Sequence, residues 1–110
     1  MTNIQELSLI EKKVLKKFFN KVDGHVSNFD LSCVLERRES KVGFMTILDK
    51  REFLKTDFTL RVYDKMPNGK IDGYEVGFVV YVEDGYVSAI EGFVYGDKWP
   101  DNSSSLEFCT

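Results

Sequence analysis

Apolar residues near the start of the chain follow the period of an amphipathic helix. They recur three or four positions apart and fall on one arc when successive residues are turned by about 100°. Lysines occupy the opposite arc; a solvated helix face is their ordinary role, although such a face can also bind an anionic partner. Ser8 and Glu11 have the spacing of a capping box, and Asp23-Gly24 is a typical helix end. The apolar arc consists of Leu7, Val14, Leu15, Phe18, Phe19 and Val22, and the basic arc of Lys12, Lys13, Lys16, Lys17 and Lys21.

Runs in which apolar and polar residues alternate come after the helix and predict β-strands. Two such runs are joined by a polar turn, and a third precedes a turn that contains Asn-Gly. The polar stretch between the second and third runs predicts a short helical turn or a loop. In chain order the segments are the strand Leu31–Glu36, the turn Arg37–Lys41, the strand Val42–Leu48, the polar stretch 49–57, the strand Phe58–Tyr63 and the turn Met66–Gly69.

The strongest local signal is a β-hairpin in the second half of the chain. Asp84-Gly85 separates two β-rich runs, Tyr74–Glu83 and Tyr86–Tyr95. Asp-Gly between such runs is typical of a two-residue type I′ turn. The hairpin is therefore expected to pair its two strands directly, with the turn at Asp84-Gly85.

This turn also sets the register of the two strands. Glu83 is expected to face Tyr86, and Phe78 is expected to face Glu91. In that register the more apolar face of the hairpin, which is expected to meet the helix, carries Tyr74, Val76, Phe78, Val80, Val82, Val87, Ala89, Glu91, Phe93 and Tyr95. The other face is mixed and is expected to be partly exposed.

Glu91 needs an explanation on the apolar face, because an unpaired buried carboxylate is costly. A structural ion pair is the favoured interpretation, with Arg38 as the candidate partner and Arg37 and Arg61 as alternatives. A contact with a protein partner is a second interpretation. As a catalytic acid, Glu91 would need a base such as His25, the single histidine of the chain.

One helix, about five strands and a serine-containing end predict a single α+β domain over residues 1–110. The expected architecture is a twisted, mostly antiparallel sheet with the N-terminal amphipathic helix packed on one face. Residues 101–110 are expected to form a loose tail.

Composition narrows the class of protein. Hydrophobic residues make up 43% of 110 residues, which is enough for a modest core. The net charge of −3 argues against direct nucleic-acid binding. Neither an apolar run of membrane-spanning length nor a signal-peptide pattern is evident, so a soluble cytoplasmic protein is expected. Cys33, Cys109 and one histidine do not suit a disulfide scaffold or a zinc site, and we expect no metal, no cofactor and no enzymatic activity.

Charge is unevenly divided along the chain. Residues 71–110 contain 8 acidic side chains and only Lys98 as a base, whereas residues 1–70 contain 14 basic and 10 acidic side chains. This division favours a cationic protein partner for the second half. Acidic residues in turns also keep a hairpin soluble, so the pattern alone leaves both explanations open.

Two groups of short motifs resemble the immunity proteins of contact-dependent growth inhibition and related polymorphic toxin systems. The resemblance covers roughly residues 36–100. The first group is Arg38-Glu39-Ser40-Lys41-Val42-Gly43-Phe44 followed by Thr46, and the second comprises Gly77-Phe78, Glu83-Asp84-Gly85-Tyr86, Ile90-Glu91-Gly92, Tyr95-Gly96 and Trp99-Pro100.

The resemblance implies inhibition rather than catalysis. An immunity protein of this kind binds its cognate toxin domain, often a nuclease, and blocks the active or substrate-binding surface. Carboxylates would then act as electrostatic partners of a basic toxin and aromatic residues as anchors. The expected contact residues are Asp72, Glu75, Glu83, Asp84, Tyr86, Asp97 and Trp99. The alternative is a small-molecule or peptide-binding module that uses the face of the C-terminal hairpin.

Overall fold

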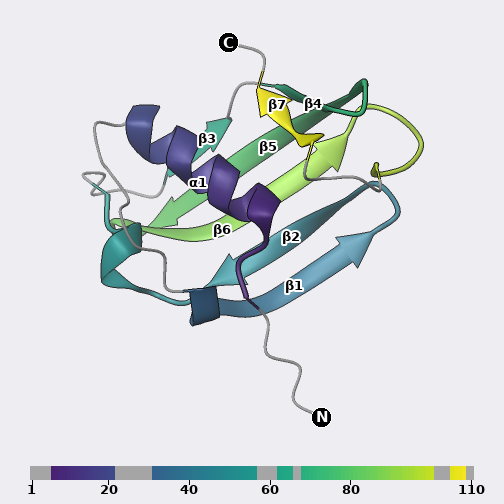
Figure 1. The fold of residues 1–110 in the computed structure, drawn as a ribbon. Coiled ribbons are helices and arrows are strands. Elements are labelled where there is room, and N and C mark those ends of the chain that lie inside the picture. Colours follow the sequence, from purple (N-terminus) through teal and green to yellow (C-terminus); the bar gives the residue numbers. More distant parts are fainter. Residues whose placement is uncertain (1–5, 22–30, 57–61, 66–67, 101–104, 109–110) are drawn as a thin grey trace.

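A single helix lies across one face of an antiparallel sheet in the computed structural model of the chain (Figure 1). The structure describes residues 6–21, 31–56, 62–65, 68–100 and 105–108. The helix, α1, spans Leu9–Lys21. The predicted α+β class, with the N-terminal helix on one face of the sheet, is confirmed.

Within the described residues the sheet has seven strands rather than about five. Its strand order is β1-β2-β6-β5-β4-β7, with β3 also pairing with β5, and every pairing is antiparallel. The predicted hairpin, β5–β6, therefore lies in the middle of the sheet, and β1 is a terminal strand. The strands are β1 (Val34–Ser40), β2 (Gly43–Leu48), β3 (Val62–Lys65), β4 (Gly69–Ile71), β5 (Tyr74–Glu83), β6 (Tyr86–Val94) and β7 (Glu107–Phe108).

The helix begins at the predicted capping box. The backbone N–H of Glu11 donates to Ser8 Oγ at 3.2 Å, and the backbone N–H of Ser8 donates to Glu11 Oε1 at 2.8 Å. These bonds satisfy N–H groups that have no partner inside the helix. The predicted end at Asp23-Gly24 lies outside the described residues. The helical segment contributes Leu7, Ile10, Val14, Leu15, Phe18 and Phe19 to the core.

The turn of the β5–β6 hairpin has the predicted geometry, but its register changes after two residue pairs. Asp84 and Gly85 have φ values of 55° and 82°, as a type I′ turn requires. Glu83 faces Tyr86 and Val82 faces Val87, whereas Tyr81 faces Ala89. Ser88 is therefore an extra residue in β6, and this β-bulge shifts every later pair by one position.

The bulge moves Glu91 to the opposite face from the one predicted. Phe78 faces Gly92, and Glu91 faces Val79. Because side chains alternate along a strand, a shift by one residue exchanges the two faces of β6. Ile90 is fully buried under the helix, while Glu91 lies on the outer face of the sheet, which we define as the face away from α1.

Strand β1 extends through residues that the sequence placed in a turn. The predicted turn Arg37–Lys41 lies mostly in the strand, and the turn itself is at Lys41-Val42. Residues Leu31–Cys33, predicted as strand, form a 3-10 helix. Charged residues are tolerated in β1 because an edge strand has solvent along one side.

The connection after β2 agrees with the sequence where it is described. The polar stretch 49–57 contains a 3-10 helix, Glu52–Leu54. Of the predicted strand Phe58–Tyr63, residues 58–61 lie outside the described part, and β3 begins at Val62. The predicted turn at 66–69 is described only from Asn68, and Gly69 already belongs to β4.

A second Asp-Gly turn and a short last strand were not predicted. Asp72 and Gly73 have φ values of 51° and 85° and join β4 to β5. Strand β7 pairs with β4, and Leu106 is only 5% exposed. A Cβ on Gly69 would lie 2.7 Å from Leu106 Cδ1 and 3.0 Å from the Glu107 carbonyl oxygen, so a larger residue here would crowd β7. Glu107 and Phe108 are thus part of the sheet and not of a loose tail, whereas residues 101–104 and 109–110 lie outside the described part.

Candidate functional site

The β5–β6 hairpin separates the predicted contact residues into two groups. Strand β5 has ten residues, so its ends are roughly 30 Å apart at about 3.3 Å per residue. The residues at the open end of the hairpin are Asp72, Glu75, Asp97 and Trp99, and those at its turn are Glu83, Asp84 and Tyr86. They do not form one continuous contact patch.

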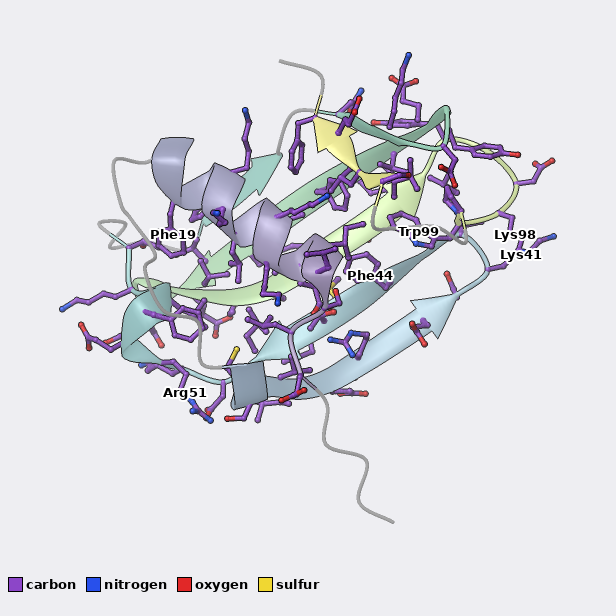
Figure 2. The ribbon with its side chains drawn as sticks, in the orientation of Figure 1. Phe19, Lys41, Phe44, Arg51, Lys98 and Trp99 are labelled. Carbon is purple, nitrogen blue, oxygen red and sulfur yellow. The ribbon has the colours of Figure 1, made fainter. Side chains whose placement is uncertain are left out.

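Trp99 caps the core and is not an exposed anchor. Its ring packs edge-on against Phe44 and Phe78, with ring centroids 5.4 Å and 6.3 Å away. Its backbone N–H donates to the Lys41 carbonyl at 2.8 Å. Figure 2 shows Phe44 and Trp99 on the helix side of the sheet, with Lys41 and Lys98 at the nearby end. Trp99 therefore links the segment after β6 to the β1–β2 turn.

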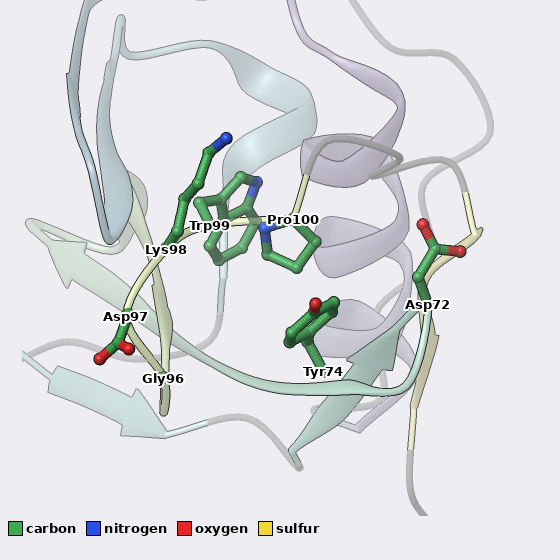
Figure 3. Close-up of a pocket in the computed structure, with 7 residues that line it drawn as sticks. All are labelled: Asp72, Tyr74, Gly96, Asp97, Lys98, Trp99 and Pro100. Atoms are coloured by element: carbon green, nitrogen blue, oxygen red, sulfur yellow. The ribbon is translucent and has the colours of Figure 1, made fainter.

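A hollow of about 600 Å³ lies beside Trp99. Three of the predicted residues, Asp72, Asp97 and Trp99, line it together. Figure 3 shows Asp72 and Asp97 on opposite sides, with the apolar rings between them. The complete lining is Asp72, Tyr74, Gly96, Asp97, Lys98, Trp99 and Pro100.

Among the aromatic residues whose burial is described, two tyrosines at this end are exposed. Tyr74 is 58% exposed and Tyr95 is 50% exposed. Tyr95 is held in place, because its hydroxyl donates to Asn68 Oδ1 at 3.3 Å and its ring packs edge-on against Phe93 at 5.3 Å. Asn68 Nδ2 also donates to Glu75 Oε2 at 3.3 Å. A network of polar contacts thus positions side chains that remain open to solvent.

We call this surface the acidic tyrosine rim. The sequence predicted its carboxylates but selected Trp99 and Tyr86 as aromatic anchors in place of Tyr74 and Tyr95. The Asp72-Gly73 pair carried the missing signal, since it has the same turn composition as Asp84-Gly85 and places Tyr74 at an exposed strand end. The rim consists of Asp72, Tyr74 and Asp97, which line the hollow, and of Glu75 and Tyr95, which are joined through hydrogen bonds with Asn68.

The turn end of the hairpin is packed against the connection after β2. The Gly85 carbonyl accepts hydrogen bonds from the Thr56 backbone N–H at 2.6 Å and from Thr56 Oγ1 at 3.1 Å. Lys50 Nζ lies 4.9 Å from the centre of the Tyr86 ring, and the backbone of Lys55 pairs with that of Tyr86. The turn is thus held to the connection after β2, and the Tyr86 ring is half-buried.

Glu91 does not pair with Arg38 as predicted. Tyr81 donates its hydroxyl proton to Glu91 Oε1 at 2.6 Å, and Arg38 pairs with Glu36 at 2.8 Å. Met45 stands between them, because it faces Arg38 on one side and Glu91 on the other. The hydrogen bond from Arg38, aided by its charge, holds the pKa of Glu36 below its usual value.

A buried ion pair joins α1 to β1 and was not predicted. Glu11 is fully buried and accepts hydrogen bonds from Arg37 Nε at 2.9 Å and from Arg37 Nη2 at 2.6 Å. Thr46 Oγ1 donates to the same carboxylate. The bond to Glu11 raises the pKa of Arg37. The signal was present, because Glu11 lies on the apolar arc four residues after Leu7.

The described residues also bear on the predictions about a metal site, a membrane span, Cys33 and His25. No group of three or more histidine, cysteine, aspartate or glutamate side chains is placed to hold a metal within that part of the chain. The same residues contain no helix with the length and apolar character needed to cross a membrane. Cys33 is buried in the core. His25 lies outside the described residues, so its pairing with Glu91 is not tested.

Compared with protein-family models, with curated proteins and with solved structures, the chain matches none of them. The chemistry of the rim follows from its own groups. Asp72, Glu75 and Asp97 are exposed hydrogen-bond acceptors, and the two tyrosines present both an apolar ring and a hydroxyl. In proteins generally, groups of this kind can accept hydrogen bonds from cationic or neutral donor side chains.

Proposed function

We propose that this chain is an immunity protein of a contact-dependent growth inhibition or related toxin system. In this proposal it acts in the cytoplasm, binds a cognate toxin domain through the acidic tyrosine rim, and catalyses no reaction. The motifs in residues 36–100 support the assignment to the class of immunity proteins. The choice of binding surface is supported by one observation: two half-exposed tyrosines, Tyr74 and Tyr95, lie among exposed carboxylates at one end of the sheet.

The tyrosines are suited to provide most of the affinity. Tyrosine offers a large contact area with few rotatable bonds, and it is enriched among the residues that dominate protein interfaces. The rim charges add selectivity and faster association with a basic partner. Lys70 and Lys98 lie near the three carboxylates and offset part of their negative charge. The electrostatic contribution to the binding free energy is therefore modest.

The rim is ordered before any partner binds. Ser105 Oγ donates to Asp72 Oδ1 at 3.0 Å, and the Asp72 backbone N–H donates to Ser105 Oγ at 3.2 Å. The Tyr95 backbone N–H donates to the Glu75 carbonyl at 3.1 Å. A surface that is already held in place loses less conformational entropy on binding.

Charge reversal at each end of the hairpin tests the proposal. The full chain and the toxin domain encoded beside its gene are purified, and the dissociation constant is measured by calorimetry at low and high salt. Asp97→Lys is expected to weaken binding about tenfold at low salt and less at high salt. Glu83→Lys is the matched control at the turn end and should change the constant by less than about twofold.

Two results would contradict the proposal. One is a toxin domain that does not bind the wild-type chain and still kills cells that express it. The other is a larger effect of Glu83→Lys than of Asp97→Lys, which would move the contact to the turn end.

The hollow beside Trp99 favours a second candidate function, a small-molecule or peptide-binding module. Its volume of about 600 Å³ lies in the range of ligand sites. Trp99 is the only tryptophan in the chain, so its fluorescence reports directly on this hollow. A peptide or metabolite that shifts this emission and raises the melting temperature of the isolated chain would support the second function.

A further inference from the structure

Strand β1 leaves one edge of the sheet unpaired within the described residues. It is the first strand in the order β1-β2-β6-β5-β4-β7, and only β2 pairs with it. Figure 1 shows β1 as the outermost strand on the side away from β4 and β7. The strands of the β5–β6 hairpin are both interior, so neither is free to add another strand. An edge such as β1 presents backbone N–H and C=O groups that a further strand can use.

The charges along this edge are complementary to those of a second, reversed copy. On each face of the strand a glutamate and an arginine lie two residues apart. Glu36 and Arg38 lie on the outer face of the sheet, in the same rows as Ile47 and Met45. Arg37 and Glu39 lie on the helix side, in the rows of Thr46 and Phe44.

An antiparallel pairing of two β1 strands centred on Arg37 opposes unlike charges. Glu36 of each copy then faces Arg38 of the other, twice about the two-fold axis, and opposite charges across strands are favourable. Arg37 faces its own counterpart at the axis. That contact is tolerable because each Arg37 already forms two hydrogen bonds to its own buried Glu11. A slip of one residue would oppose side chains from different faces and is therefore excluded.

An exposed apolar side chain lies on the same edge. Leu35 is 63% exposed and precedes the regular part of the strand, at the irregularity between Val34 and Glu36. In the pairing centred on Arg37 its backbone lies opposite that of Glu39 in the second copy. The aliphatic part of that glutamate would cover some of the leucine, which adds apolar burial to the backbone hydrogen bonds.

We propose that two copies of this chain associate through β1, in antiparallel register about Arg37, to form one continuous sheet. The interface is a symmetric C2 contact, in which the same surface serves both partners. It does not rest on the proposed function, since it uses the backbone edge of β1 and the side chains of Glu36 and Arg38, none of which belongs to the acidic tyrosine rim.

Charge-reversed variants test the partner and the register together. Glu36→Arg makes both outward positions arginine, and Arg38→Glu makes both glutamate. Each variant alone is expected to dimerise at least about tenfold more weakly than the wild type, because two attractive pairs become repulsive. An equimolar mixture restores unlike pairs and is expected to form a heterodimer. Molar mass is measured by sedimentation equilibrium over a range of concentrations.

The mixture also shows that the variants are folded, because an unfolded chain cannot complete the sheet. A wild-type chain that remains monomeric at high concentration would overturn the proposal. So would a dimer whose mass does not change in either variant, since another surface would then join the copies. Weak dimerisation of both variants without recovery in the mixture would contradict the register centred on Arg37.

Discussion

Arg37 binds the buried carboxylate of Glu11 with two guanidinium nitrogens, at 2.9 Å and 2.6 Å, across 26 residues of sequence. The same arginine donates to the Glu6 carbonyl at 2.7 Å. Through this one side chain the edge strand β1 holds both the first turn of α1 and the segment that precedes it. No buried side-chain nitrogen or oxygen of the described residues lacks a hydrogen-bond partner.

Removing this arginine should be strongly destabilising. Arg37→Ala leaves the Glu11 carboxylate buried without its cation, and we expect a loss of about 3 kcal/mol in the free energy of unfolding. Urea denaturation followed by circular dichroism measures this loss. The control is Arg38→Ala, which removes an exposed ion pair and should have a much smaller effect. Equal losses in the two variants would contradict the role assigned to Arg37.

The exposed pair between Arg38 and Glu36 predicts a pKa change that can be measured directly. Arg38→Gln removes the hydrogen bond that lowers the pKa of Glu36, so this pKa should rise toward the ordinary glutamate value. Because the native pKa lies below the unfolded one, the pair stabilises the fold above the unfolded pKa and ceases to do so as pH falls through the native pKa. NMR titration of the Glu36 carboxyl carbon gives the shift. The control is Arg51→Gln, which breaks the pair with Asp49 and should leave the pKa of Glu36 unchanged.

The turn between β4 and β5 depends on the backbone conformation of Gly73. Its φ is 85°, and a Cβ added there would meet no atom within 4 Å beyond the neighbouring residues, so alanine would cause no clash. Gly73→Ala should nevertheless destabilise the fold by about 1 kcal/mol, because an L-residue disfavours this region. Gly96→Ala is the matched control, since a Cβ on Gly96 would meet only Val94 Cγ2, at an ordinary contact distance of 4.0 Å, and the φ of Gly96 is not in that region. Urea denaturation measures both variants. An unchanged free energy of unfolding in Gly73→Ala would contradict the role assigned to Gly73.

Trp99 and Tyr74 line the same hollow but should respond differently to truncation. Trp99→Ala removes a ring packed on Phe44 and Phe78 and should cost about 3 kcal/mol of stability. Tyr74→Ala removes a largely exposed ring and should change stability by less than about 0.5 kcal/mol. It should instead weaken binding to the toxin domain. Thermal unfolding and calorimetric titration of both variants separate the two roles, and a Tyr74→Ala variant with unchanged affinity would remove Tyr74 from the contact surface.

Short-range signals in the sequence predicted the local structure well. The Ser8–Glu11 capping box starts the helix, and Asp84-Gly85 forms the turn between β5 and β6. Each depends on groups only a few residues apart, so the amino-acid types are sufficient to specify it. The same reasoning applied to Asp72-Gly73 would have found the second turn and the exposed position of Tyr74.

The face on which Glu91 lies could not be obtained in this way. A single extra residue, Ser88, exchanges the faces of β6, and nothing in the alternation of residues marks it. Trp99 was equally ambiguous, because its burial depends on Phe44 and Phe78, which come from two other strands.

By itself, then, the sequence determined the α+β class, the start of the helix and the central hairpin turn, since these follow from periodicity and local hydrogen bonding. Only the tertiary structure decided which carboxylate is buried, which aromatic rings are exposed and which contact residues lie together. Those outcomes depend on strand order and register, where a shift of one residue in a single strand reverses which side chains meet the core.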